Sequence, residues 1–330
     1  MQQRAILLLR AVLSISNEEA EVTKAYVVTG AGPVGWTVAV QLAEQGRQVR
    51  VLTRSGSGPE HPLIERIKGD AKDPAILRPA FAGAKAVFHC IHGSAYSAST
   101  WKAELPAAEQ AVLAAAQEAG AVVVFPESLY SYSEPGSVMT EGSPRRAAGG
   151  KRGVRTALLL AREASLAPTV SVVAGDFFGP RVRMAHGGER MVAPILAGKN
   201  VSVVGSARQP HSFTYVPDLA GAMIAAADQP SAWNAVWHAP TGPALTQQQL
   251  ARAFAAAAGR PAPKVRVLPG WTLRAAGLFS GDARELAEML YQFERPFIMD
   301  SAASEVALGV TPTPLEMAVA ATVDWWRQQG

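Results

Sequence analysis

The chain is poor in cysteine, in charge and in aromatic side chains. Cys90 is the single cysteine among 330 residues, so an internal disulfide and a cysteine-based metal cluster are excluded, and a reducing compartment, by default the cytoplasm, is favoured. Charged residues make up 18% and aromatic residues 7%, and the 31 Lys and Arg side chains are scattered, which gives nucleic-acid binding little support. The apolar share of 48% is typical of a globular α/β protein.

An apolar segment lies near the start, at residues 5–15 (AILLLRAVLSI), but it is too short to span a bilayer. Arg10 interrupts it, and NEEAE follows where the cleavage site of a signal sequence would have small residues. We therefore expect no membrane association. Residues 1–23 are predicted to be an N-terminal appendage, either a docked helix or the product of a start site placed too early.

From Lys24 onward, short β-branched runs alternate with longer amphipathic runs, which is typical of βαβ units and a parallel sheet. We predict strands at 25–29, 49–53, 64–68, 86–90, 121–125 and 169–174, and helices at 33–45, 74–81, 103–119 and 152–165. The predicted fold is α/β: a doubly wound, parallel Rossmann sheet that binds NAD(P) at 24–175, with a smaller C-terminal substrate-binding region at 176–330 packed on it.

The segment VVTGAGPVG carries Gly30, Gly32 and Gly35 in the G-x-G-x-x-G spacing, directly after a predicted strand and before a predicted helix. The first two glycines let the backbone turn tightly and approach a pyrophosphate, and the third lets helix and strand pack closely. The helix N-terminus, which includes Pro33 and Val34, offers free N–H groups to the anion. This motif predicts a dinucleotide site.

The second predicted strand ends in Thr53 and Arg54, where an NAD-selective site usually has an acidic residue for the ribose hydroxyls. A guanidinium cannot accept those hydrogen bonds, but it can pair with a 2′-phosphate and stack on adenine. The sequence therefore favours NADP over NAD as the cofactor. A solvent-facing arginine is the alternative interpretation.

Four further cofactor contacts are predicted at the carboxyl ends of strands, where a doubly wound sheet binds its ligand. Asp70 and Ala71 follow the third strand, and Asp70 could accept a hydrogen bond from the adenine amino group or instead cap the helix that starts near Pro74. Cys90 and Ile91 follow the fourth strand. We interpret Cys90 as a small apolar contact with the cofactor and not as a nucleophile.

At several points the sequence resembles the extended or atypical short-chain dehydrogenases, the group often called NAD-dependent epimerases/dehydratases. The resemblance covers about Lys24 to Trp326 and is carried by TGAGPVG, GDAKDPAILRPAFAGAKAVFHC, LYSYSEPGSVMTEGSP, GDFFGPRV and HSFTYVPDLAGAM. It implies a Tyr-x-x-x-Lys pair with a Ser or Thr, in which the tyrosine exchanges a proton with the substrate oxygen. The lysine would hold the ribose and lower the pKa of the tyrosine.

The spacing of that catalytic pair fails in this chain. If Lys151 is the lysine, Ala147 stands at the tyrosine position, and Pro126 stands at the usual Ser or Thr position. One hypothesis transfers the chemistry to the loop PESLYSY, with Tyr130 as the proton donor and Ser128 or Glu127 orienting the carbonyl. The other hypothesis is that the protein binds cofactor without turnover. Tyr130 could equally anchor the loop through its hydroxyl.

Other side chains are interpreted more simply. The basic cluster around Lys151 is expected to be mainly a solvated loop and helix start, with Lys151 itself as the exception. Arg181 and Arg183 could meet an anionic substrate. Tyr96 and Trp101 could wall an apolar site near the nicotinamide. The cluster consists of Arg145, Arg146, Lys151, Arg152 and Arg155.

The leading hypothesis is an NADP-dependent oxidoreductase or epimerase that acts on a small carbonyl or alcohol. The alternative is a regulatory protein that senses NADP without catalysis, and a quinone or isoflavone-type reductase is a third option on the same fold. The expected partners are a small-molecule substrate and, as a possible assembly, a second copy of the chain; nucleic acid and membranes are not expected. No residue set predicts a metal site.

Overall fold

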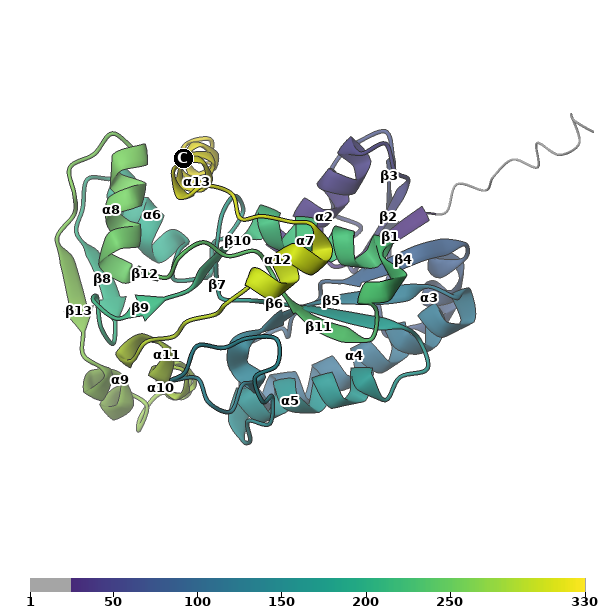
Figure 1. Cartoon of the computed structure of the whole chain (residues 1–330), viewed down its shortest axis with the longest axis horizontal. Helices are drawn as coiled ribbons and strands as arrows, with labels where there is room; N and C mark the ends of the chain where they lie inside the picture. Colours follow the sequence, from purple (N-terminus) through teal and green to yellow (C-terminus); the bar gives the residue numbers. More distant parts are fainter. Residues whose placement is uncertain (1–24, 330) are drawn as a thin grey trace, which may run out of the picture.

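A seven-stranded parallel sheet lies at the centre of the computed structural model, which describes residues 25–329 (Figure 1). The predicted appendage at 1–23 lies outside the described residues. The strand order is β11-β6-β5-β4-β1-β2-β3. The predicted doubly wound parallel sheet is thus confirmed, and it has a seventh strand, β11, beyond the six predicted. The strands are β1 (Ala25–Thr29), β2 (Val49–Thr53), β3 (Ile64–Lys68), β4 (Ala84–His89), β5 (Val122–Ser128), β6 (Thr169–Ala174) and β11 (Ala235–His238).

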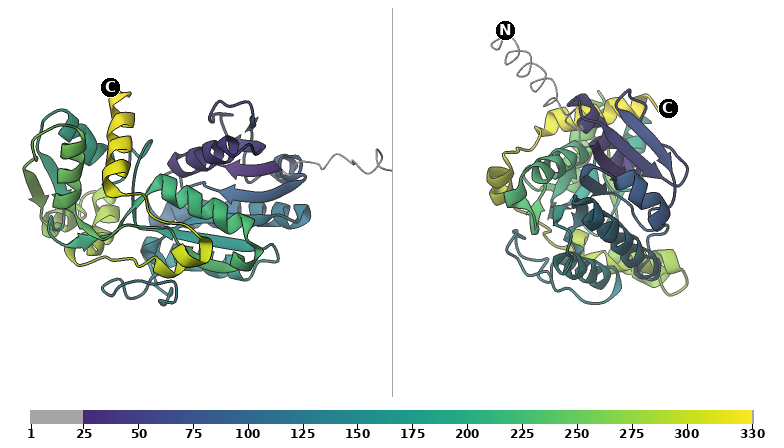
Figure 2. Two further views of the ribbon diagram at one scale, coloured as in Figure 1. Left: turned by 45° about the horizontal axis from the view of Figure 1, so that its top comes forward. Right: turned by 90° about the vertical axis from the view of Figure 1, so that its right-hand side faces the viewer.

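Helices cover both faces of this sheet, which is why its central strands are nearly continuous apolar runs (Figure 2). All five residues of β1 are buried, and β6 is buried throughout. One face is covered by α2 (Pro33–Glu44) and α7 (Val216–Asp228), and the other by α3 (Pro74–Phe81), α4 (Ala98–Ala119) and α5 (Gly150–Glu163).

The start of α3 excludes one of the two interpretations of Asp70, the helix cap, and leaves the adenine contact as a prediction. Asp73 occupies the N-cap position of this helix, and its side chain accepts a hydrogen bond from the amide of Ala75 at 2.9 Å. The carboxylate of Asp70 instead accepts the amide of Lys72 at 2.9 Å in the preceding turn. Asp70 is therefore not the cap of α3.

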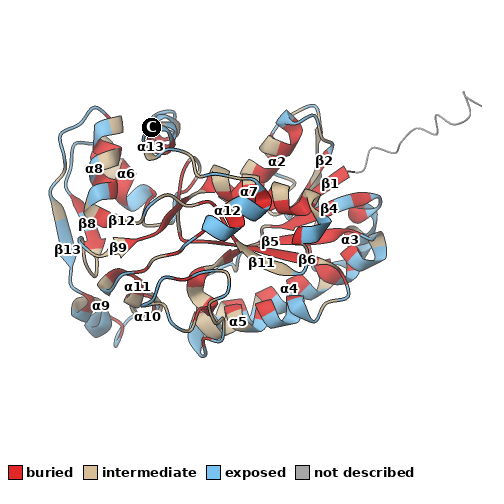
Figure 3. Cartoon of the chain, in the orientation of Figure 1, coloured by how far each residue is buried: buried red, intermediate tan, exposed pale blue. Residues whose placement is uncertain are grey.

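The chain after β6 builds a second apolar core beside the sheet, and Figure 3 shows buried residues in both parts. Trp326, from the last helix, is buried in this core. No helix within residues 25–329 is long and apolar enough to cross a membrane. The second part contains α6 (Glu189–Leu196), α8 (Gln247–Ala257), α13 (Leu315–Arg327) and the parallel pair β8 (Val201–Val204) and β13 (Val265–Leu268).

Shorter elements connect the two parts. Strand β7 (Asp176–Phe178) pairs in parallel with β10 (Phe213–Tyr215), and β9 (Pro210–His211) pairs antiparallel with β12 (Leu245–Thr246). The helices α9 (Gly270–Ala276), α10 (Gly281–Glu288), α11 (Tyr291–Glu294) and α12 (Ala302–Leu308) follow along the chain. The part of the chain beyond residue 175 also supplies β11 and α7 to the central sheet and its cover.

Candidate functional site

The glycine turn after β1 has the geometry that the motif predicts. Gly30 has a φ of 90°, in the left-handed region that favours glycine, and a Cβ there would lie 3.0 Å from the backbone oxygen of Cys90. A Cβ on Gly35 would overlap the backbone oxygen of Gly30. A Cβ on Gly32 would meet nothing within 4 Å. Gly30 and Gly35 are thus required by the fold, whereas Gly32 leaves open space.

The N-terminus of α2 is open to a ligand beside this space. Gly32 is the N-cap residue, and within residues 25–329 no side chain caps the helix. Pro33 has no N–H group, and the amides of Val34 and Gly35 belong to the first turn, whose N–H groups have no partner inside the helix. Free donors, the helix dipole and the missing Cβ together suit a pyrophosphate, so the residues present fit a dinucleotide.

The two predicted residues at the end of β2 lie in different surroundings. Thr53 donates its hydroxyl to the backbone oxygen of Ser57 at 2.8 Å, which holds the turn after the strand. Arg54 is exposed, and within the described residues its guanidinium has no ion pair or hydrogen bond. Ala71 is buried and Asp70 exposed at the end of the neighbouring strand β3. This arrangement leaves Arg54 able to meet a phosphate.

The carboxyl end of β4 is uncharged and unreactive. His89 lies 2.8 Å from the hydroxyl of Thr29 through Nδ1, and burial lowers its pKa to about 4, so it is neutral at pH 7. Burial also raises the pKa of the Cys90 thiol, which keeps the sulfur protonated. Ile91 lies against Gly30. These positions favour the predicted apolar contacts over a nucleophile.

Tyr130 lies just beyond β5, in the short 3-10 helix Leu129–Ser131, and pairs with a tyrosine from the loop after β4. The hydroxyls of Tyr130 and Tyr96 are 2.9 Å apart, and the ring of Tyr130 stacks on Trp101 with centroids 6.2 Å apart. Burial raises the pKa of both phenols above the ordinary value. The two tyrosines are therefore protonated hydrogen-bonding groups, not phenolates.

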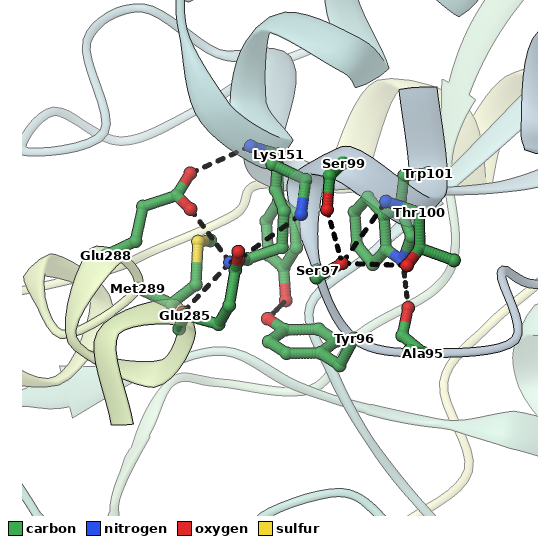
Figure 4. Close-up of polar contacts among 12 residues, drawn as sticks. Ala95, Tyr96, Ser97, Ser99, Thr100, Trp101, Lys151, Glu285, Glu288 and Met289 are labelled. Atoms are coloured by element: carbon green, nitrogen blue, oxygen red, sulfur yellow. Dashed lines mark hydrogen bonds and ion pairs between the residues drawn. The ribbon is translucent and has the colours of Figure 1, made fainter. Parts of the chain in front are cut away.

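Lys151 differs from the expected helper of a catalytic tyrosine. Its side chain is fully buried, and its ammonium donates to Glu285 and Glu288 of α10, with 2.8 Å to Oε2 of Glu288 (Figure 4). The ammonium also lies 4.9 Å from the ring centroid of Tyr96, but the pKa of this tyrosine is raised and not lowered. Burial is the main cause of the raised pKa of Tyr96, and two carboxylates face Lys151, so the predicted help of Lys151 to a catalytic tyrosine stays a prediction.

Glu127, one of the two residues predicted to orient a carbonyl, is instead held in ion pairs away from solvent. Its carboxylate is buried and pairs with Arg162 at 2.8 Å and with Arg155 at 3.6 Å. Arg155 is buried as well, so this member of the basic cluster is not solvated surface. Ser128, in contrast, is half-buried and donates its hydroxyl to Glu127 at 3.2 Å.

Asp176 and the buried His211 form a pair that no sequence pattern predicted. Nε2 of His211 lies 3.0 Å from Oδ2 of Asp176. Nδ1 lies 3.0 Å from the backbone oxygen of Gln292, and this oxygen can only accept a hydrogen bond. Burial alone would raise the pKa of Asp176, but the facing imidazole holds it below its ordinary value. A negative charge is therefore fixed where β7 begins, just after β6, and after burial it is a further cause of the raised pKa of Tyr96 and Tyr130.

Arg181 lies near the N-terminal turn of α2. Its guanidinium stacks 3.6 Å from the ring centroid of Trp36, and its φ of 68° is in the left-handed region that side chains rarely adopt. Within residues 25–329 it makes no ion pair, so its donors are available to an anion. Arg183 instead lies beside Trp325 and Trp326 and donates to Gln329 at 3.2 Å.

The sequence matches the model of the NAD dependent epimerase/dehydratase family over residues 26–236. It is also 26% identical over 227 residues to the uncharacterized protein y4nG of Sinorhizobium fredii (strain NBRC 101917 / NGR234). That alignment covers 63% of this chain and 54% of the relative, so the chain spans about half the length of the curated relative.

Solved structures share the fold. The Bordetella bronchiseptica enzyme WbmH in complex with NAD+ has a TM-score of 0.72 at 20% identity, covering 93% of this chain and 99% of that one. A UDP-glucose 4-epimerase from Thermotoga maritima, solved with UDP-glucose, also has a TM-score of 0.72 at 20% identity, covering 92% and 99%. The structure called gox2253 has a TM-score of 0.73 at 24% identity, covering 93% and 99%. Such identities show a common architecture.

Proposed function

The chain belongs to the NAD-dependent epimerase/dehydratase family, as its sequence motifs indicated, and we propose that it is a nicotinamide-dinucleotide oxidoreductase or epimerase acting on a small carbonyl or alcohol. The observation that carries this proposal is the glycine turn: open space at Gly32 beside the uncapped N-terminus of α2. WbmH, which shares the fold, is described in complex with NAD+. When bound, the cofactor would accept or supply the hydride.

The proton would come from the tyrosine pair in place of the missing Tyr-x-x-x-Lys tyrosine. Because burial raises the pKa of Tyr130 and Tyr96, both hydroxyls are protonated at neutral pH. One of them can donate a hydrogen bond to a carbonyl oxygen and transfer its proton as that oxygen becomes a hydroxyl, while the other, 2.9 Å away, supports it. Ser128 could add a second hydrogen bond to the same oxygen.

The proposal is tested in two steps. Calorimetric titration with NADPH and NADH should show binding of at least one of them, and turnover is then measured on a panel of small aldehydes, ketones and alcohols. Tyr130→Phe should lower kcat by about 100-fold, the size of a lost general acid, with the dissociation constant of the cofactor unchanged. Absence of binding to both cofactors would refute the whole proposal.

Arg54→Ala tests the proposed preference for NADP. Removing the guanidinium should weaken NADPH about tenfold or more, because a charge-assisted contact to a 2′-phosphate is lost, and should leave NADH unchanged. The control is Arg66→Ala on the adjacent strand β3, an exposed arginine that pairs with Glu60. Equal effects on the two cofactors would contradict a role of Arg54 in choosing between them.

A second function, binding of the dinucleotide without catalysis, is favoured by one group of residues. Ala147 stands where the resemblance implies the tyrosine, and Lys151 is held by Glu285 and Glu288. A wild-type protein that binds NADPH but turns over no member of the carbonyl panel would support this sensor function. Turnover that depends on Tyr130 would support the enzyme.

A further inference from the structure

Lys151 is a buried cation whose oxygen ligands all come from one short segment of the chain (Figure 4). Its ammonium donates to the backbone oxygen of Glu285 at 2.9 Å, to Oε2 of Glu288 at 2.8 Å and to Oε2 of Glu285. The three donors of the ammonium thus have three acceptors. An ammonium removed from water is costly unless it is paired, so without this segment Lys151 would require other oxygen ligands.

The segment that supplies these ligands, residues 270–288, is here named the α9–α10 arm. Within it only Gly270 and Gly277 are buried, and α10 buries no residue. Three of its large apolar side chains face outward: Phe279 is 93% exposed, and Trp271 and Leu278 are exposed as well, whereas Leu273 and Leu286 are half-buried. The α9–α10 arm buries little apolar surface of its own, so the contacts of Glu285 and Glu288 with Lys151 and with the amides of Lys151 and Ala98 are a large part of what holds it against α4 and α5. Such a segment opens at low energetic cost.

The carboxylates of Glu285 and Glu288 also accept hydrogen bonds from backbone amides beside Lys151. Oε1 of Glu288 accepts the amide of Lys151 at 2.8 Å, and Oε2 of Glu285 accepts the amide of Ala98 at 3.3 Å. A Cβ on Gly150 would overlap the carboxylate of Glu288, and both Gly149 and Gly150 have positive φ. The backbone at the start of α5 is therefore shaped to let oxygen atoms approach Lys151 closely.

This position borders the proposed cofactor site. The ammonium of Lys151 lies 4.9 Å from the ring centroid of Tyr96, in the loop that follows β4, and the hydroxyl of Tyr96 meets Tyr130 after β5. The order of strands reverses between β4 and β1, and a doubly wound sheet binds its ligand outside the carboxyl ends of the strands at that point. Lys151 is therefore a cation at the edge where the dinucleotide is proposed to bind.

We propose that Glu285 and Glu288 are internal competitors for Lys151, occupying positions that oxygen atoms of a bound dinucleotide would take. The α9–α10 arm then has to release Lys151 before the cofactor is fully held. This inference rests on the proposed function. Only molecules in which Lys151 is released bind the cofactor at full strength. The apparent dissociation constant is therefore the intrinsic dissociation constant divided by the fraction of such molecules.

The test compares cofactor affinities of matched variants. Glu285→Gln combined with Glu288→Gln keeps the side-chain shape and removes the competing charges, so NADPH and NADH should bind about tenfold more tightly than to the wild type. Asp282→Asn, an exposed carboxylate on the same helix α10, is the control and should change nothing. Adding Lys151→Met to the double variant should remove the gain, which ties it to the lysine.

Hydrogen exchange supplies a readout that needs no variant. The amides of residues 281–288 in the wild-type protein should exchange faster when NADPH is bound, and slower exchange would overturn the inference because the arm would then close on the cofactor. An unchanged or weakened affinity of the double variant would also overturn it. If the double variant does not fold, Glu288→Gln alone takes its place. If the wild type and all variants bind neither cofactor, the proposed function itself fails.

Discussion

Replacing Arg162 with Met should lower the free energy of unfolding by about 3–5 kcal/mol, because the substitution leaves the buried carboxylate of Glu109 without its partner and that of Glu127 with only the longer contact to Arg155. The guanidinium of Arg162 donates to Glu109 at 2.6 and 2.8 Å and to Glu127 at 2.8 Å, and all three residues are buried. A methionine fills most of the same space, so charge and not volume is what changes. Chemical denaturation at pH 7 measures the loss.

Arg78→Met is the matched control, since Arg78 also binds a glutamate, Glu118, with two hydrogen bonds, but at the surface. Exposed pairs contribute about 0–1 kcal/mol, so this variant should be close to the wild type. A loss of similar size in both variants would contradict the argument from burial. A loss below about 1 kcal/mol for Arg162→Met would do the same.

The difference in the free energy of unfolding between the wild type and Arg162→Met should depend on pH. Burial alone would raise the pKa of Glu109, but Arg162 and its hydrogen bonds hold the pKa below the ordinary value. A carboxyl whose pKa is depressed by folding contributes stability above its unfolded pKa, about 4.3, and that contribution is lost as the pH falls through the folded pKa. The wild type should therefore lose stability below about pH 4, and the difference between wild type and Arg162→Met should narrow there.

The central sheet could be predicted because it depends on local patterns. The predicted bounds of β1 and β2 agree with the structure, since each is a short buried run next to a glycine or a turn. Strand β11 was missed because AVWH is short, lies in a segment rich in loops and has only one buried residue, so no apolar run marks it. Its place at the sheet edge is set by pairing with β6, which is more than 60 residues earlier in the chain.

The candidate site likewise combines a motif that is local in the sequence with contacts between residues that are distant in the sequence. The glycine turn is a local motif, and its geometry followed from spacing and context alone. The partners of Lys151 are 134 and 137 residues away, and Asp176 and His211 meet only because β7 pairs with β10. Neither distant carboxylate stands in a recognisable pattern. Sequence reasoning therefore located the cofactor turn but could not foresee which charges would surround the predicted lysine.

The glycine turn gives the largest expected effect on binding, through two variants that separate its roles. Gly35→Ala puts a Cβ into the backbone oxygen of Gly30, so the turn has to shift, and the free energy of unfolding should fall by about 1–3 kcal/mol. Dinucleotide binding should be lost with it, since α2 can no longer pack against the turn in the same way. Thermal or chemical denaturation and calorimetric titration measure the two effects separately.

Gly32→Ala should behave in the opposite way. A Cβ at Gly32 meets no protein atom within 4 Å and its φ of −69° suits alanine, so stability should be unchanged or slightly increased. The methyl group would instead occupy the space through which a pyrophosphate approaches the amides of α2, and NADPH and NADH should both bind at least about 30-fold more weakly, a cost of roughly 2 kcal/mol. Gly136→Ala, on an exposed loop with equally open surroundings, serves as the control. Full affinity in Gly32→Ala would mean that the ligand of this turn does not approach its backbone, and the dinucleotide would have to be placed elsewhere.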